Sequence, residues 1–582
     1  MIKQQPGSIC PHLFPVRVIQ SVIPRTTSEF RGDGGATATA GSVPVSPATA
    51  LGLASAAQAP PGGPARRWDM TRTLRAAAAV AGVAVICVYL GIALTRLGYP
   101  GPLEILEGNS LVEVHRILAG QQLYAAPSAS YVPDGYTPLY FAVSAAAASV
   151  LGHSFLPLRL VSLVASLACF VILGRLVQRE TRSRTAGLAA AGLLAGTYFA
   201  TATWFDVGRV DSLFLALSVA GLYAARRASS TRGAITAGLL LGAAFLTKQS
   251  ALAEGAAVLA ALAAGSGRRI AGPAVAAYVA VIGGSTLVLG LASHGWYVYY
   301  VFEQMSQHAL SAGSASQFWT TELLPTFGVA ICAVVLAARR MPLVLVAGCA
   351  ALAVESFAAR AQTGSNVNDL LPAYLSVALL AGLAMAGQPP RLPSRTSGRL
   401  TAFTRWRRGA GGQWVPVAVS ALVVVQIGLL AGGFRLSQAF PPKADRIADQ
   451  RLMAGVRALG GTVAIPADPG IAVTAGLPPT EDTVAAADVL RASEQNPKGI
   501  FITSLAQAVA TQKFSGIITE YQQDLQGFPP DLRLYYYRCP RAPLDGVMSI
   551  PFSANAEATP VSVWLPIGHG PSCAAVARTF GS

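Results

Sequence analysis

Long apolar runs separated by short polar or Arg-rich joints dominate the chain from Met70 to about residue 434. The runs are continuous rather than alternating, a pattern typical of membrane-spanning helices and not of the strands of a β-barrel. We therefore predict a polytopic α-helical membrane protein with about eleven spans. They lie near residues 75–97, 155–177, 185–205, 211–225, 233–248, 250–265, 270–292, 323–338, 341–358, 369–387 and 414–434.

Arginine residues gather before the first span and in the joint after every second span, as at Arg226 and Arg227. Because cytoplasmic joints carry an excess of Lys and Arg, these joints and the N-terminus are predicted to be cytoplasmic. Eleven spans then place the C-terminal tail outside. The expected location is the plasma (inner) membrane, with several passes.

Residues 137–151 are apolar, but counting them as a span would move every later Arg cluster to the outside. Fifteen residues of helix cover about 22 Å, against a hydrocarbon core of about 30 Å. The segment is therefore predicted to be an interfacial or re-entrant helix on the outer face, where the polar stretch from Gly98 to Tyr136 also lies.

The two ends of the chain differ from the middle. Residues 1–69 are rich in Pro, Gly, Ala, Ser and Thr without sustained periodicity, which predicts disorder. Met70 directly precedes the first apolar run, so translation could start at Met1 or at Met70. The predicted domains are the disordered segment 1–69, the membrane domain 70–434 and an extracytoplasmic α/β domain 435–582.

The tail alternates helical and strand patterns. We expect helices at 444–461 and 504–514 and strands at 462–468 and 516–522. Cys539 and Cys573 lie together in this polar region and could pair outside the cytoplasm, although spacing gives no geometry.

Composition agrees with a membrane protein, since 53% of the 582 residues are hydrophobic and only 12% are charged. A soluble globular chain carries about 25% charged residues. The net charge of +16 would suggest nucleic acid in a soluble protein, but here the arginines lie at the ends of apolar runs and act as topology signals. We expect membrane lipid as a partner, and no nucleic acid.

The first predicted outer loop is dense in ionisable groups, among them Glu104, Glu107, Glu113, Asp134 and Tyr136. A single carboxylate held near the membrane surface, such as Glu107, could act as a general base on an acceptor hydroxyl. The alternative is an ordinary solvated loop acid, which the spacing alone favours.

Asp206, Arg209 and Asp211 lie between two apolar runs on the predicted outer side. They could form a structural ion pair at a helix end, or present a cation to a phosphate and carboxylates to a sugar hydroxyl or a metal. The sequence requires no cofactor, and a divalent ion at Asp206 and Asp211 is open because no spacing demands one.

Two further polar features lie at the predicted outer ends of spans. Lys248 interrupts an apolar segment and could meet a lipid phosphate or snorkel to the interface. Arg360 could bind phosphate, and the nearby amides Asn366 and Asn368 could bind sugar hydroxyls. Cations, acids and amides at the mouths of several spans suggest a site for a substrate whose lipid tail lies in the bilayer.

The chain resembles the membrane glycosyltransferases of the GT-C fold, and within them the bacterial branch akin to protein O-mannosyltransferases and aminoarabinose transferases (glycosyltransferase family 39-like). The resemblance covers about residues 75–265, and GSNVNDLLP extends it to about 387. It is carried by the ordered runs EGNSLVEVHRILAGQQLY, YTPLYFAVSAAAASVLG, PLRLVSLVASLACFVILGRLV, FDVGRVDSLFLALSVAGLY and GLLLGAAFLTKQSAL.

The resemblance implies roles for several residues. The family's catalytic base in the first outer loop falls on Glu107, an assisting acid falls on Asp206 or Asp211, and a lysine near the donor phosphate falls on Lys248. Thr137 and Gln249 stand where many relatives have proline and glycine, which weakens inference about the substrate more than about the fold.

The expected function is transfer of a sugar from a polyprenyl-phosphate donor to an acceptor hydroxyl of a glycan, lipid or protein on the outer face. Glu107 would take the acceptor proton, Arg209, Lys248 and Arg360 would bind the donor phosphate, and Tyr136, Asn366 and Asn368 would bind substrate. The alternatives are a lipid-linked sugar flippase or secondary transporter, and an envelope scaffold. Transporters usually carry polar groups at the bilayer midplane in repeated halves, a pattern not evident here.

Overall fold

The structure is a computed structural model that describes residues 69–337, 341–386, 414–519, 522–539 and 562–581. The segment predicted to be disordered, apart from Asp69, lies outside the described residues, and so does the Arg-rich joint 388–413. The residues from Trp68 onward form one compact unit, so the predicted domain boundary near residue 435 stays a prediction.

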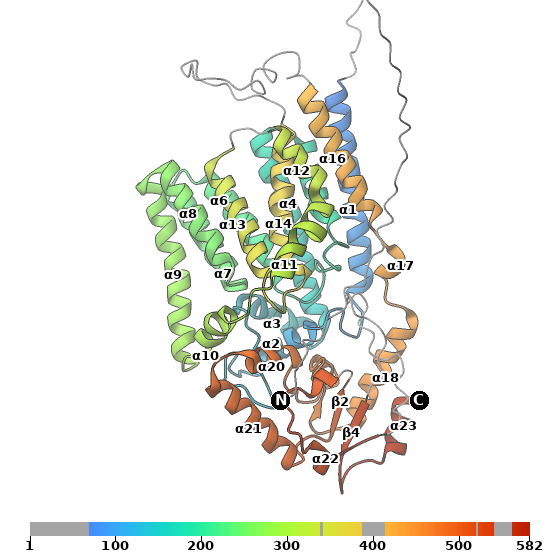
Figure 1. Cartoon of the computed structure of the whole chain (residues 1–582). Coiled ribbons are helices and arrows are strands. Elements are labelled where there is room, and N and C mark those ends of the chain that lie inside the picture. Colours follow the sequence, from blue (N-terminus) through green and yellow to red (C-terminus); the bar gives the residue numbers. More distant parts are fainter. Residues whose placement is uncertain (1–68, 338–340, 387–413, 520–521, 540–561, 582) are drawn as a thin grey trace, which may run out of the picture. The chain divides into compact units, whose positions relative to one another are not determined.

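The membrane domain is built of helices, as the apolar runs predict (Figure 1). Each of the eleven predicted spans contains a helix. The helices are α1 (Met70–Arg96), α2 (Glu107–Leu118), α3 (Leu139–Leu151), α4 (Phe155–Thr181), α5 (Arg184–Gly196), α6 (Asp211–Arg227), α7 (Thr231–Thr247), α8 (Ala251–Ser266), α9 (Arg268–Ala292), α10 (Trp296–Val298), η1 (Tyr299–Gln304), α11 (Ala312–Gln317), η2 (Phe318–Leu323), α12 (Leu324–Ala337), α13 (Leu343–Arg360), η3 (Val367–Leu370), α14 (Leu371–Ala384) and α16 (Trp414–Gly432).

Seven helical segments of the described part are long and apolar enough to cross a membrane. They start at Met70, Phe155, Arg268, Ala312, Leu343, Val367 and Trp414. Helices α3, α7 and α8 are apolar but shorter, so the total of eleven spans stays a prediction. Helix α3 has only 13 residues, as expected for a segment too short to span, and its placement at the interface stays a prediction.

Small residues let the helices of the bundle approach closely. Helix α1 packs along α5, and a Cβ atom added to Gly82 of α1 would lie 2.8 Å from the backbone oxygen of Leu188 in α5. Helix α4 packs on α5 and α6, α7 packs on α6 and α9, and α13 packs on α8 and α14. Close backbone approach at small residues is typical of helix packing in membranes.

Two predicted cytoplasmic segments are joined by an ion pair. The Arg226 guanidinium at the end of α6 lies 3.0 Å from the Glu180 carboxylate at the end of α4. These two Arg-rich ends therefore lie on the same side of the bundle, as the positive-inside pattern requires. Which side is cytoplasmic stays a prediction.

The C-terminal region, residues 435–582, contains a small sheet and several helices, which confirms its α/β character. The second predicted helix, α21, begins nine residues before Ser504. The elements are α17 (Leu436–Ala439), α18 (Lys443–Leu459), β1 (Val463–Ala464), α19 (Gly470–Thr474), α20 (Thr483–Arg491), α21 (Gln495–Ala510), β2 (Gly516–Thr519), η5 (Gln522–Leu525), α22 (Leu532–Tyr535), β3 (Tyr536–Arg538), β4 (Ser562–Pro566) and α23 (Cys573–Gly581).

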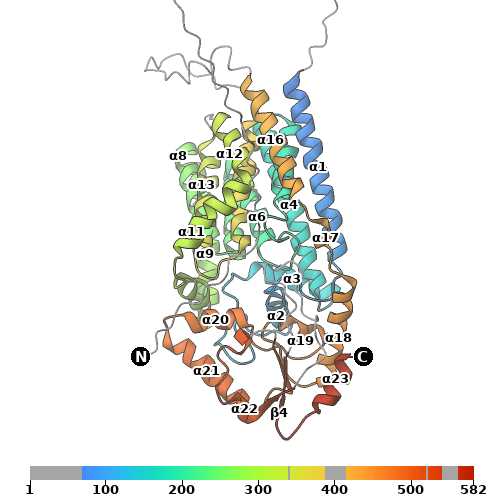
Figure 2. The same ribbon diagram turned by 45° about the vertical axis from the view of Figure 1, so that its right-hand side comes forward.

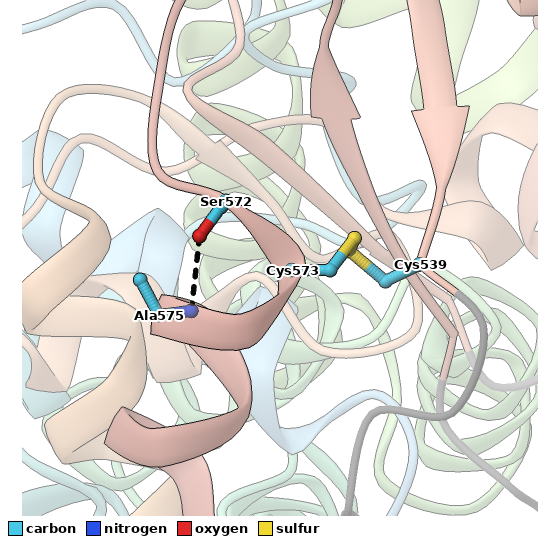
Figure 3. Close-up of a disulfide and its surroundings, with 4 residues drawn as sticks. All are labelled: Cys539, Ser572, Cys573 and Ala575. Carbon is cyan, nitrogen blue, oxygen red and sulfur yellow. Dashed lines mark hydrogen bonds between the residues drawn. A yellow bond between two sulfur atoms is a disulfide. The ribbon is translucent and has the colours of Figure 1, made fainter.

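The four strands form one sheet in the order β1-β2-β4-β3. Strand β2 pairs parallel with β1 and antiparallel with β4, which also pairs antiparallel with β3. Cys539, which follows β3, forms a disulfide with Cys573, the first residue of α23 (Figure 3). The Ser572 side chain caps the same helix by accepting from the Ala575 amide. The structure therefore contains the pairing that the sequence left open.

The C-terminal region packs against the polar segment that follows α1. Helix α19 contacts α2, and Figure 2 shows α19 and α20 next to α2. The Lys513 ammonium donates to Ser130 at 2.6 Å, and the Ala129 amide donates to Ser504 at 3.1 Å. These contacts join the C-terminal region to the loop that holds the candidate acids.

Candidate functional site

The polar residues of three separate sequence segments meet where α7 ends and α6 begins. Lys248 is the C-cap of α7, Asp211 is the first residue of α6, and Asp369 lies in η3. The Lys248 ammonium lies 3.0 Å from the Asp211 carboxylate and 3.2 Å from that of Asp369. These residues are 37 and 121 positions from Lys248, so the fold alone brings the cluster together.

Asp211 is held by further donors. The Asn368 amide donates to Oδ1 at 3.2 Å, and the Trp204 indole donates to Oδ2 at 2.8 Å. The aspartate is almost completely buried. Asp211, Lys248 and Asn368, which the sequence assigned separately to acid, phosphate and sugar binding, therefore belong to one hydrogen-bonded group.

Arg209 forms the second part of the site. It is buried, and its guanidinium donates to the Tyr136 hydroxyl at 3.0 Å and to the Leu106 carbonyl at 3.3 Å. Its Nε atom lies 3.6 Å from the Glu104 carboxylate and has no hydrogen-bond partner among the described residues. Because its Nε–H donor has no acceptor among the described residues, the guanidinium could still bind an anionic group.

Glu104 is the carboxylate of this group with an open oxygen. Oε2 accepts from the Leu106 amide at 3.0 Å, whereas the buried Oε1 has no hydrogen-bond partner in the described part of the chain. Burial raises the pKa of Glu104 to about 7, against the opposing attraction of Arg209. A carboxyl group with such a pKa is suited to exchanging a proton near neutral pH.

Glu107 has a different environment. Its two oxygens accept from Arg159 at 2.8 and 2.7 Å, from the Leu103 amide at 2.7 Å and from the Gly208 amide at 2.6 Å. The side chain is fully buried. These four hydrogen bonds join the start of α2 to α4, to the loop after α1 and to the loop before α6.

Asp206 lies in another group than Asp211. The Tyr198 hydroxyl donates to its Oδ1 at 2.9 Å, and Arg96, which also contacts Tyr198, lies 3.4 Å from the same oxygen. Both predicted acids of the segment 204–212 are buried, but only Asp211 contacts Lys248.

Arg360 and Asn366 have other partners. The Arg360 guanidinium donates to Glu322 at 2.7 to 3.1 Å and to Ser365 at 2.7 Å. Asn366 is exposed and caps η3 by accepting from the Val367 amide. The hydrogen bonds of Arg360 and Asn366 go to these other residues, so their predicted substrate roles stay predictions.

Sequence reasoning assigned no role to several residues of the site, among them Asp369, Arg159 and Glu104. Arg159 lies inside an apolar run, and a lone charge at such a position signals a buried partner or a function. Glu104 lies in the same loop as Glu107 and has no spacing that distinguishes it, so only the structure separates their environments.

The metal prediction stays open. Among the residues that the structure describes, no group of three His, Cys, Asp or Glu side chains is arranged to hold a metal ion. Asp206 and Asp211 contact different cations, Arg96 and Lys248.

Part of the site lies in a stretch of the chain that matches a known protein family. Residues 134–296 match the family model described as dolichyl-phosphate-mannose-protein mannosyltransferase. The matched stretch includes Tyr136, Arg209, Asp211 and Lys248. No curated protein matches the chain significantly.

Two solved structures share the fold. The structure of ArnT from Cupriavidus metallidurans bound to undecaprenyl phosphate has 14% sequence identity and a TM-score of 0.53, and the similarity covers 84% of this chain and 99% of that chain. The apo structure of the same protein gives 12% identity and a TM-score of 0.52 over the same shares. The family match and the fold support a glycosyl transfer reaction. The chain is therefore a multi-pass membrane protein with the GT-C fold of membrane glycosyltransferases.

Proposed function

We propose that this protein transfers a sugar from a polyprenyl-phosphate donor to an acceptor hydroxyl on the outer face of the membrane. Two observations carry the proposal. The buried cations Arg209 and Lys248 lie in the stretch that matches a glycosyltransferase family model, and Arg209 lies 3.6 Å from the Glu104 carboxylate, which has an oxygen without a hydrogen-bond partner among the described residues. Cations stabilise a leaving phosphate, and a carboxylate near its pKa accepts a proton.

In the proposed reaction the acceptor oxygen forms a bond to the anomeric carbon while the bond from that carbon to the phosphate oxygen breaks. The acceptor proton passes to a carboxylate, and the polyprenyl phosphate leaves with the bonding electron pair. Arg209 and Lys248 would stabilise its growing negative charge. A single displacement of this kind inverts the anomeric configuration.

Two carboxylates are candidates for the base. Glu107 is the base implied by family resemblance, but its oxygens already accept four hydrogen bonds. Glu104 has a buried oxygen without a partner among the described residues and lies beside Arg209. We therefore propose Glu104 as the base and Glu107 as a positioning residue that holds the loop against α4.

The deciding experiment measures release of free polyprenyl phosphate by the detergent-purified full chain. The substrates are labelled polyprenyl-phosphate sugars, supplied with a membrane extract as the source of acceptor. We expect Glu104→Gln to lower kcat by at least about 100-fold, the usual contribution of a general base. The exposed Glu303 provides a matched control, and Glu303→Gln should retain wild-type activity.

The outcomes separate the candidates. Full activity of folded Glu104→Gln together with loss in folded Glu107→Gln would return the base to Glu107. No release from any donor by folded wild-type protein would contradict the transferase and favour the transporter.

A further inference from the structure

Helices α17 and α18 connect the spanning helix α16 to the rest of the C-terminal region. Helix α16 is long and apolar enough to cross a membrane, and it ends at Gly432. Leu436, the first residue of α17, follows four residues later, and four residues of extended chain span at most about 14 Å. Helix α17 therefore lies close to the point at which the chain leaves the hydrocarbon core.

One side of this connection packs against the ends of the membrane helices. Ala439 of α17 is completely buried in the same hydrophobic core as Leu430 of α16 and Tyr99, which follows α1. The Arg446 guanidinium of α18 lies 5.8 Å from the centroid of the Tyr99 ring. Figures 1 and 2 both show α17 beside the part of α1 that is nearest to the C-terminal region. These contacts hold α17 and the start of α18 at the level where α1 and α16 end.

The other side of the connection is apolar and exposed. Leu436 and Phe440 are 49% and 44% exposed, and Ile447 in the second turn of α18 is 50% exposed. Leu94 and Leu429, near the ends of α1 and α16, are exposed in the same way, as expected of side chains that face lipid. Single exposed apolar residues are common on proteins, but a group of them at the end of a membrane bundle marks contact with the membrane.

Cationic side chains accompany these apolar residues. Lys443 and Arg451 lie four positions before and after Ile447, so the three side chains share one face of α18, and all three are exposed. Between residues 435 and 451 the chain carries four Lys or Arg residues and two Asp residues, of which Asp449 is buried. An exposed surface that combines apolar side chains with a surplus of positive charge binds the boundary between the acyl chains and the head groups of anionic lipids.

We propose that residues 436–451 form a lipid-binding surface of the C-terminal region, and that its occupant is anionic phospholipid of the bilayer. Leu436 and Phe440 insert among the acyl chains, and Lys443 lies beside the lipid phosphate. The surface attaches the C-terminal region to the membrane at a second place, besides its covalent link to α16. This inference concerns a different part of the molecule from the candidate site and does not assume a transfer reaction.

The first measurement locates the lipid-binding surface relative to lipid. The full chain carries an NBD fluorophore on a cysteine introduced by Phe440→Cys, in a background in which the reactive Cys10, Cys87 and Cys332 are replaced by Ser. The protein is reconstituted in bilayers that contain nitroxide-labelled phosphatidylcholine, which quenches the fluorophore on contact. We expect strong quenching at position 440 and little at Leu534→Cys, an exposed position of α22, which Figure 2 shows at the end of the C-terminal region away from the membrane helices.

A label on the native Cys87 verifies incorporation into the bilayer, since this cysteine is exposed on the spanning helix α1. If the label at Cys87 is quenched and the label at position 440 is not, the surface does not lie in lipid and the inference is overturned. A label introduced by Leu436→Cys takes the place of the label at 440 if Phe440→Cys does not fold.

The second measurement tests the preference for anionic lipid. At equal mole fractions, nitroxide-labelled phosphatidylglycerol should quench the label at 440 more than nitroxide-labelled phosphatidylcholine. Lys443→Gln should lower this preference by up to about fivefold, because one cation near an anionic surface contributes about that factor. Arg533→Gln, which removes an exposed cation from α22, should leave the preference unchanged.

Equal quenching by the two lipids, or an unchanged preference in folded Lys443→Gln, would overturn the inference. Neither measurement contains a sugar donor, so failure of this inference and failure of the proposed function are observed separately.

Discussion

Arg159 shows why a single charged residue lies inside an otherwise apolar run. Its guanidinium is fully buried at the start of α4 and forms two hydrogen bonds to Glu107. It also donates to the carbonyls of Tyr99 and Gly101, both at 2.6 Å. One side chain thus fixes the loop after α1 and the first turn of α2, which places Glu104 opposite Arg209.

Removing Arg159 should therefore destabilise the protein. Arg159→Ala leaves the Glu107 carboxylate buried without its cation, which costs about 3–5 kcal/mol. Thermal unfolding of the detergent-purified protein measures this loss. The exposed Arg175 of the same helix is the control, and Arg175→Ala should change stability by no more than about 0.5 kcal/mol. Equal effects of the two substitutions would show that the Glu107 pair is not a structural support.

Glu104 should control the acidic limb of the pH profile. A base acts in its ionised form, and burial raises the pKa of Glu104 to about 7. Activity should therefore be fully present above pH 8 and fall about tenfold for each pH unit below 7. The donor is a phosphodiester, so its own charge stays constant over this range.

The check is kcat/KM of the wild type between pH 5 and pH 9. A limb with a midpoint near pH 4.5 would indicate a carboxylate in an ordinary environment. The residual activity of Glu104→Gln should lack the limb.

At the scale of elements, apolar runs and small residues account for most of the helix positions. Helix α21 is an informative difference, because the prediction started it at Ser504 and the structure starts it at Gln495. Pro497 and Gly499 have low helix propensity, so the sequence pattern gave no helix over these first turns. Pro497 lies in the first turn, where its missing N–H is not needed, and buried Phe501 packs in the core of the C-terminal region.

The contact between α1 and α5 provides a test of packing. Gly82→Val would place its side chain against the backbone of α5, where a Cβ atom already comes within 2.8 Å of the Leu188 oxygen. Such overpacking should destabilise the bundle by about 1–3 kcal/mol in a thermal unfolding experiment. Gly91→Val is the matched control on the same helix, because a Cβ atom there meets nothing within 4 Å. If both variants unfold alike, close packing at Gly82 contributes nothing to stability.

At the scale of the whole molecule, the C-terminal region is part of the compact unit that begins at Trp68. Some of its buried residues, among them Phe501 and Leu505, pack in one core with Tyr297 and Tyr300, which lie after α9. The inter-segment contacts of Lys513 and Ser504 add polar support. The region is therefore built to stay in contact with the candidate site.

The disulfide should stabilise this region. Cys539 and Cys573 are 34 residues apart, and closing a loop of that length contributes about 3–4 kcal/mol. We expect the double variant Cys539→Ser, Cys573→Ser to expose the C-terminal region to trypsin at a lower temperature than the wild type. Replacing Cys87 and Cys332, which are free, should leave the cleavage temperature unchanged. Unchanged cleavage in the double Cys539, Cys573 variant would contradict a stabilising role.

The sequence alone determined the fold class, the helix positions and the segments that carry the polar site. Hydrophobicity is a local property, so continuous apolar runs mark the helices, and buried charges such as Asp211 and Lys248 are visible as interruptions. The fold class and the GT-C resemblance are confirmed by the structure and by its likeness to the ArnT structures.

Only the tertiary structure decided which charges are neighbours. Lys248 meets Asp369 from 121 residues away, Glu107 meets Arg159, and Arg360 meets Glu322. The pairing of a buried charge depends on which distant segments the packing brings together, and no spacing along the chain records that. For the same reason, only the folded protein shows that Glu107 accepts four hydrogen bonds, whereas one oxygen of Glu104 has no partner among the described residues.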